Sequence, residues 1–237
     1  MRTSSRAGFV AGLAAGVIAV AGAASAQSAS PSPEPERPGA RFEVDARLGV
    51  ALPSGDLANK VPASDNVSMM VPFGVGAGVR WPSGTYLGAY FSYGILAMKH
   101  GGVACPAGWT RCTGHDVRLG AEMLFHLRSR KPVDPWFGFG FGYEWLTYHA
   151  SLAQSAGELT DTVTIEGYEY LNLQLGIDFA LRKALTLGPV LTFTFASYGD
   201  LTAERTGSAT SPSTSQGIAS GFHTWVFVGA RGSFSFL

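Results

Sequence analysis

Eight stretches of alternating apolar and polar residues follow one another in this chain, and the connections between them alternate between long and short. Between residues 41 and 52 every second side chain is apolar, whereas most of those between them are charged or small. A period of two is typical of a β-strand with two unlike faces. The long connections are expected at residues 53–68, 99–115, 150–164 and 199–221, and the short ones at 82–84, 128–135 and 182–184.

Unlike connections at the two ends of a set of alternating strands are typical of a transmembrane β-barrel. In lipid the apolar face of each strand points outward, the other face lines a narrow interior, and the ladder closes because no strand edge can stay unpaired. The sequence therefore predicts an all-β fold, an eight-stranded antiparallel transmembrane β-barrel with short periplasmic turns and long extracellular loops. It covers residues 41–237 as one domain.

The N-terminus has the pattern of a secretory signal. Arg2 and Arg6 precede an uncharged, Ala-rich stretch that ends in small residues at positions 24–26, which predicts a signal peptide over residues 1–26, cleaved near Ala26. An uncleaved transmembrane helix is the alternative, but the stretch is only weakly apolar. Residues 27–40 are rich in Pro and Ser and are expected to form a disordered periplasmic tail.

Charge composition restricts the partners. Lys plus Arg and Asp plus Glu both number 17, and loss of the signal peptide with its arginines leaves a mildly acidic chain, so electrostatics favours no nucleic-acid partner. We expect a monomer in the outer membrane of a Gram-negative bacterium, in contact with outer-membrane lipid and lipopolysaccharide and, during biogenesis, with the barrel assembly machinery. No cofactor is expected.

The inward faces of the predicted strands carry charges of both signs. An eight-stranded barrel has an interior that side chains can fill, so these charges decide whether anything passes. They form either a structural plug, which we favour, or a gate in which a change of partners opens a narrow path. The predicted lumen ion network consists of Glu43, Asp45, Arg47, Arg80, Arg118, Glu122, Glu144, Asp178 and Arg231.

Strand levels predict which of these charges meet. Asp45 and Arg47 are expected near Arg231, and Arg118 near Glu144. Glu122 and Asp178 are expected at one level, where they would repel each other unless Arg80 or Arg47 reaches them.

Aromatic residues near strand ends suggest two interfacial girdles. Trp225 and Phe227 are apolar on the lumen side, and a bulge near Gly229 is expected to re-aim them. The expected girdle residues are Trp81, Trp136, Phe234 and Phe236 at the periplasmic end, with Tyr93, Tyr143, Trp145 and Tyr198 nearer the loops.

Cys105 and Cys112 lie in the second long connection, which is expected outside the cell, where disulfides persist. A disulfide is the favoured interpretation. A metal site that includes the flanking His100 and His115 is the rival.

A nucleophile with a positioned base is the pattern of an acyl-transfer enzyme, and the nearest match is His126 with Ser129. Both are expected at the periplasmic turn, far from the lipid A of the outer leaflet, so no catalytic residue is predicted. His149 and His223 are interpreted as polar loop residues.

The chain resembles the small eight-stranded outer-membrane barrels of the OmpA transmembrane-domain and opacity-protein type. The resemblance covers residues 41–237 and is carried by LGVALPSGDL after the first strand, the strand PWFGFGFGYEW, the strand LGPVLTFTF and a phenylalanine-rich last strand. Proteins of this type usually end in an aromatic residue, whereas here Leu237 follows Phe236, which places the assembly signal one residue out of phase.

The sequence thus predicts a non-enzymatic outer-membrane barrel that supports the membrane or displays its loops, among them the Ser, Thr and Gly-rich segment from Glu204 to Ser220. The alternatives are a narrow gated solute or proton channel and an outer-membrane lipid-modifying enzyme.

Overall fold

The computed structural model describes residues 39–236, apart from residues 59, 130, 156, 208 and 209. The predicted signal peptide and residues 27–38 of the predicted tail lie outside the described part. The elements are β1 (Arg41–Ala58), β2 (Val61–Pro62), α1 (Ala63–Asn66), β3 (Val67–Arg80), β4 (Thr85–Met98), β5 (Arg111–His126), β6 (Val133–Gln154), β7 (Gly157–Ala180), β8 (Leu185–Gly207) and β9 (Thr210–Phe236).

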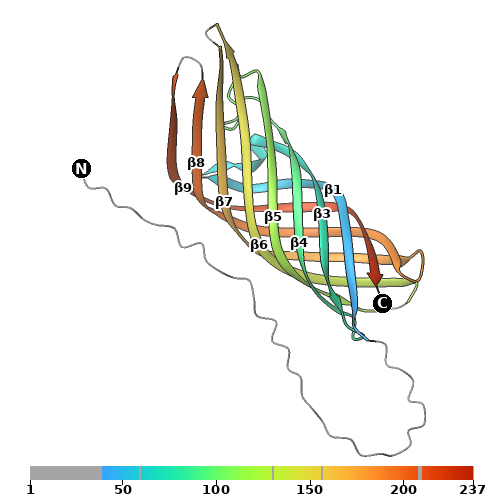
Figure 1. The fold of residues 1–237 in the computed structure, drawn as a ribbon. Coiled ribbons are helices and arrows are strands. Elements are labelled where there is room, and N and C mark those ends of the chain that lie inside the picture. The colour runs from blue at the N-terminus through green and yellow to red at the C-terminus, as the bar shows by residue number, and fades with distance from the viewer. Residues whose placement is uncertain (1–38, 59, 130, 156, 208–209, 237) are drawn as a thin grey trace, which may run out of the picture. The chain divides into compact units, whose positions relative to one another are not determined.

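The long strands form one closed antiparallel ring (Figure 1). From β1 through β3 to β9 each strand pairs with the next, and β9 pairs back onto β1 from Gly55 opposite His223 to Phe42 opposite Phe236. The two-residue β2 pairs only with β1 among the described strands. The prediction of an eight-stranded antiparallel barrel is confirmed.

Side chains alternate between the outside and the inside of the ring. In β1, Phe42 and Leu48 are 49% and 58% exposed, whereas Glu43 and Asp45 are 0% and 4% exposed. The same contrast recurs around the ring, with apolar side chains outside and polar ones buried within. This is the reverse of a water-soluble barrel and suits a surrounding of lipid.

Three tight connections lie at one end of the ring, here called the turn end: residues 81–84, 127–132 and 181–184. In the first, the Trp81 amide donates to Thr85 O at 2.8 Å and the Gly84 amide to Trp81 O at 3.0 Å. Gly84 has φ +91°, a conformation that favours glycine. The opposite end is called the hairpin end.

Two of the predicted long loops are strands instead. Residues 150–164 continue β6 and β7, which stay paired up to Gln154 opposite Gly157. Residues 199–221, including most of Glu204–Ser220, continue β8 and β9, which pair up to Gly207 opposite Thr210. The hairpin extension formed by these two ranges rises past the other strands (Figure 1).

The prediction of loops at these two ranges is wrong because Ser and Thr are compatible with a strand as well as with a loop. The β-branched threonines suit extended backbone, and their hydroxyls pair across strands, as between Thr147 and Thr164 at 3.2 Å. Arg205 on β8 also binds Asp161 on β7 through two hydrogen bonds of 2.6 Å.

The first long connection folds over the mouth of the ring instead of standing free. β1 runs on to Ala58, and α1 then buries Ala63 and Asn66. An apolar mouth cluster forms there around Leu57, Ala63, Val67, Met70, Leu96, Leu146, Ile165 and Ala219. Among the described residues, no helix has the length and apolar character needed to cross a membrane.

Candidate functional site

The lumen holds two clusters of charged side chains, and the turn-side cluster is centred on Arg231 of β9. Its guanidinium donates to Glu43 Oε1 at 2.9 Å, to Asp178 Oδ2 at 3.0 Å and to Asp45 Oδ2 at 3.4 Å. All four side chains are at most 1% exposed. One arginine therefore ties β1, β7 and β9 together.

Arg47 and Arg80 complete the turn-side cluster. Arg47 donates to Asp45 at 2.8 Å and to Glu122 at 2.6 Å, and Arg80 donates to Glu43 at 2.9 Å. Of the predicted groupings, Asp45 does meet Arg231.

Glu122 and Asp178 bind different cations. Arg47 and the Gln174 amide, at 2.8 Å, hold Glu122. Asp178 is held by Arg231 and by the Trp136 indole at 3.0 Å, with Arg80 at 3.8 Å. The arginines reach both carboxylates, so the expected repulsion is offset.

The hairpin-side cluster is centred on Glu144 of β6, which is fully buried. The Tyr198 hydroxyl donates to it at 2.7 Å and the Trp225 indole at 3.2 Å. His223 Nε2 lies 3.0 Å from its other oxygen, and Arg118 donates at 3.3 Å, as the strand levels predict. Side chains from β5, β8 and β9 therefore meet at this one carboxylate of β6.

Arg118 binds a second carboxylate in the same cluster. Its Nε and Nη2 donate to Asp116 at 3.0 Å and 2.8 Å, and its guanidinium lies 5.4 Å from the centre of the Trp225 ring. Such a bidentate pair is stronger than a single bond and fixes the plane of the guanidinium.

Between the two clusters, Tyr90 donates to Glu169 at 2.8 Å. Gly120 and Gly142 leave room for the tyrosine, since a Cβ on either would lie 2.6 Å from its side chain. A cavity of about 70 Å³ remains here, lined in part by Arg47, Arg118 and Phe227.

Carboxylates outnumber arginines in the lumen. Each arginine is shared between carboxylates, because burying an unpaired charge is far more costly than burying a paired one. The lumen carboxylates are Glu43, Asp45, Asp116, Glu122, Asp134, Glu144, Glu169 and Asp178, and the arginines are Arg47, Arg80, Arg118 and Arg231.

No family model and no curated protein sequence matches the chain. Among solved structures, the major outer membrane protein of Thermus thermophilus aligns at a TM-score of 0.59 and 13% identity, covering 83% of this chain and 99% of that one. The chain has the fold of the small outer-membrane β-barrels. Neisserial surface protein A aligns at a TM-score of 0.45 and 15% identity, covering 82% of this chain and 98% of that one. The outer membrane protein AlkL aligns at a TM-score of 0.43 and 12% identity, covering 89% of this chain and 97% of that one.

Several aromatic residues of this outer-membrane-type barrel lie elsewhere than predicted. Trp136 and Tyr198, expected in the girdles, are 2% and 3% exposed and point into the lumen. Trp225 also lies in the lumen, and the expected bulge near Gly229 is wrong, because Gly229 pairs in regular register with Gly49 and Val190. Their indole and hydroxyl groups find carboxylate partners there, which makes burial favourable.

The interpretation of His223 as a loop residue is wrong. The residue belongs to the part of β9 that β1 covers, is 1% exposed and stacks on Tyr198 with ring centres 4.1 Å apart. His149 lies on β6, where its Nδ1 is 2.8 Å from the Thr162 hydroxyl.

Glu169 is the lumen residue that the sequence pattern hid. A register shift between Glu169 and Leu171 puts Tyr168 and Tyr170, each 62% exposed, on the outside while Glu169 and Asn172 point inward. Strict alternation fails at such a bulge. Asp116, by contrast, shares the parity of Arg118, so the alternation predicts its inward direction.

His126 is buried and forms hydrogen bonds to charged side chains and not a nucleophile–base pair with Ser129. Its Nδ1 lies 3.0 Å from Asp134 Oδ2 and its Nε2 2.7 Å from Arg80 Nη2. Both ring nitrogens therefore face charged partners at the turn end.

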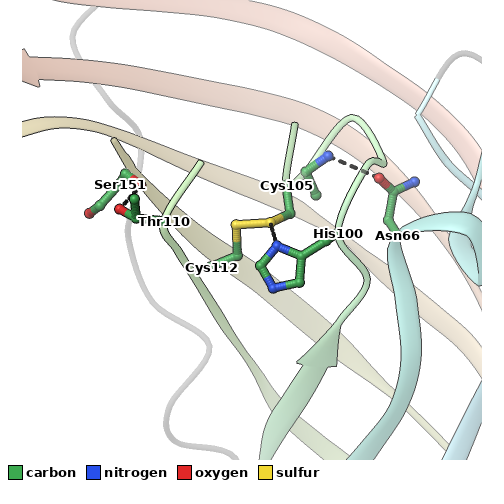
Figure 2. The surroundings of a disulfide bond; sticks show 7 residues. Asn66, His100, Cys105, Thr110, Cys112 and Ser151 are labelled. Atoms are coloured by element: carbon green, nitrogen blue, oxygen red, sulfur yellow. Dashed lines mark hydrogen bonds between the residues drawn. A yellow bond between two sulfur atoms is a disulfide. The ribbon is translucent and has the colours of Figure 1, made fainter. Parts of the chain in front are cut away.

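Cys105, in the connection between β4 and β5, forms a disulfide with Cys112 at the start of β5 (Figure 2). His100 Nδ1 lies 3.2 Å from Cys105 Sγ, and the Ala104 amide donates to Asn66 Oδ1 of α1 at 2.9 Å. With both sulfurs joined, the rival metal site would keep only one ligand, since the predicted His115 instead stacks on Tyr93 at 5.7 Å.

Proposed function

We propose that this protein is a non-enzymatic outer-membrane barrel with a closed lumen, which supports the membrane and presents its hairpin extension to the outside. The observation that carries the proposal is that side chains fill the lumen at successive levels. From the hairpin end inward, the mouth cluster, the Glu144 cluster, Tyr90 with Glu169, and the Arg231 cluster follow one another. Filled interiors are the expectation for eight strands.

The hairpin extension supports the display role. Its four strand segments stay paired side by side, β6 with β7, β7 with β8 up to Leu159 opposite Gly207, and β8 with β9. Side chains from Ser213 to Gly217 are exposed. Paired strands hold such side chains in a fixed arrangement, which lowers the entropy cost of binding a partner.

Bilayer conductance of the refolded full-length protein tests the closed lumen. The parent and Arg118→Ala are compared, with Arg205→Ala on the extension as the control of equal charge change. Absence of conductance in the parent and in both variants supports a closed barrel. Discrete openings in the parent that change in Arg118→Ala, but not in the control, would show a gated pore instead.

That gated pore is the second candidate, and two observations favour it. The lumen carboxylates exceed the arginines, and a cavity of about 70 Å³ interrupts the filling between the two clusters. A shift of Arg118 or Arg47, which both line this cavity, would join it to one end. The path would be narrow and would suit protons or small cations.

The display role is tested by replacing residues 201–217 with a tight two-residue turn. The shortened barrel should still fold, because β8 and β9 remain paired below this segment. Binding of cells carrying it to surfaces or host material should fall. Unchanged binding would leave only the supporting role.

Mass analysis of lipid A from cells with and without the protein tests the non-enzymatic part of the proposal. An altered acyl-chain pattern would make it a lipid-modifying enzyme. Mass analysis of the mature chain would show whether it begins at Gln27, as signal-peptide cleavage requires. The same proposal includes three further points. The protein is a monomer, it contacts lipopolysaccharide, and it interacts with the barrel assembly machinery during biogenesis.

A further inference from the structure

The two ends of the barrel differ in the sign of their exposed and partly exposed charges. At the hairpin end, acidic side chains exceed basic ones among the described residues: Asp56, Asp65, Glu158, Asp161, Glu166, Asp200 and Glu204 against Lys60, Lys99, Arg111 and Arg205. At the turn end the described cations are Arg41, Arg128, Lys131, Arg182 and Lys183, and the carboxylates there, Asp134 and Asp178, are buried.

Four of these turn-end cations surround one opening, here called the basic vestibule. It is a cavity of about 500 Å³ that is lined by Arg41, Lys131, Arg182 and Lys183, here called the rim cations, and also by Arg80. The turns that carry them are tied down, since the Ala180 amide donates to Pro132 O and the Ser235 amide to Ala184 O, both at 2.9 Å.

The rim cations have no carboxylate of their own. Within the described residues, Arg41, Lys131, Arg182 and Lys183 form no ion pair. The two carboxylates that line the vestibule cannot serve them. Asp134 accepts from the Arg128 amide and contacts His126, both at 3.0 Å, and Asp178 is held by Arg231 and Trp136. Among the described residues, the vestibule thus presents positive charge without a carboxylate partner around a concave opening.

Apolar side chains adjoin this charge. Trp81 and Leu181 line the vestibule and are 40% and 57% exposed, and they continue the apolar outer surface of the ring toward the opening. A ligand that fits has an anionic head for the cations and an apolar tail for this outer surface. Basic clusters at a membrane surface attract anionic lipid headgroups.

We propose that the basic vestibule binds the headgroup of an anionic phospholipid from the leaflet at the turn end. This inference rests on the proposed membrane location. The lipid phosphate would lie among Lys131, Arg182 and Lys183, with an acyl chain along Leu181 and Trp81. Bound lipid would neutralise the rim and hold the barrel at a fixed depth.

The test uses the full-length protein refolded in detergent micelles that contain equal amounts of phosphatidylglycerol and phosphatidylcholine with identical acyl chains. Native mass spectrometry counts the retained lipids. The parent is compared with Arg182→Gln/Lys183→Gln, and the matched control is Lys60→Gln/Lys99→Gln at the hairpin end. Heat-modifiable gel mobility shows that each variant is folded.

The parent should retain phosphatidylglycerol in preference to phosphatidylcholine. The turn-end double variant should lose affinity by about fivefold for each cation removed, as expected for cations near an anionic surface, and the control should keep the parent's preference. No preference in the parent, or equal loss in the two double variants, would overturn the inference.

A soluble anion is the competing ligand of the same chemistry. Glycerol 3-phosphate is therefore added at millimolar concentration to the parent complex. Retention of phosphatidylglycerol supports a lipid site, whereas complete displacement would assign the vestibule to a soluble phosphate and overturn the lipid proposal. Absence of the parent's folded, heat-modifiable band in lipid vesicles would instead count against the proposed function itself.

Discussion

Arg231 on the last strand and Glu43 on the first form an ion pair of 2.9 Å across the seam where the barrel closes, with neither side chain exposed. The two residues lie 188 positions apart in the chain. Because β1 and β9 are the strands whose pairing turns the sheet into a ring, this contact forms only when the ring is complete. Closure of the ring therefore brings the buried Glu43 carboxylate to the Arg231 guanidinium.

Arg231→Met should strongly destabilise the barrel. It leaves Glu43, Asp45 and Asp178 without their shared cation, and removing one partner of a buried pair costs about 3–5 kcal/mol. Urea unfolding in lipid vesicles measures the change in the free energy of unfolding. Arg205→Met, which removes the exposed pair with Asp161, is the control and should have little effect. Equal effects of the two variants would contradict a special role for Arg231.

Gly142→Ala should destabilise the barrel through Tyr90. The new Cβ would lie 2.6 Å from both the Tyr90 hydroxyl and Leu119 O, so the tyrosine must move and its bond to Glu169 is strained. Overpacking of this kind costs about 1–3 kcal/mol. The comparison is with Gly199→Ala, where the Cβ meets nothing within 4 Å. Urea unfolding in lipid vesicles again measures the free energy of unfolding. A Gly142→Ala barrel as stable as the parent would show that this part of the lumen is loosely packed.

Leu119→Arg should impair membrane insertion. Leu119 lies near the middle of β5 and is 53% exposed on the outer face. An arginine facing lipid at the bilayer midplane costs about 2–4 kcal/mol in a β-barrel. Val103→Arg changes an equally open position, 67% exposed, in the β4–β5 connection and should have no such cost. The folded fraction in vesicles, scored by heat-modifiable mobility, distinguishes the two. Equal yields would place Leu119 outside the lipid band.

Reduction of the Cys105–Cys112 bond should loosen the β4–β5 connection and leave the barrel intact. The connection is otherwise held by few contacts, among them the Ala104–Asn66 bond and the Thr110 hydroxyl on Ser151 O at 3.0 Å. Trypsin cleavage after Lys99 should become several-fold faster in reductant, with heat-modifiable mobility unchanged. Loss of the folded gel band on reduction would show instead that the bridge supports the ring.

The predictions for the aromatic residues are wrong for a physical reason. Trp136 and Tyr198 were placed in the interfacial girdles by residue type, although their parity along the strand pointed them inward. An indole or phenol group suits both the membrane interface and a polar lumen. Here the buried carboxylates Asp178 and Glu144 accept hydrogen bonds from Trp136 and Tyr198 and so favour the lumen. Glu169 was hidden for another reason, since the bulge beside it shifts the alternation.

The loops were misread for a similar reason. Ser and Thr suit exposed coil and exposed strand equally well, so composition alone does not separate the two. Extension of β8 and β9 to Gly207 and Thr210 depends on ladder bonds to the neighbouring strands, which only the assembled sheet supplies.

The alternation of residue types determined by itself that the chain closes into an eight-stranded barrel. It also gave the inward direction of the charges predicted to line the lumen, because side-chain direction along a strand has a period of two. Only the tertiary structure decided which charges share a partner. Glu144, for example, meets Tyr198, His223 and Trp225 through the curvature of the ring. It likewise decided that the basic vestibule forms, since Lys131 and Arg182 come together only when separate turns lie side by side.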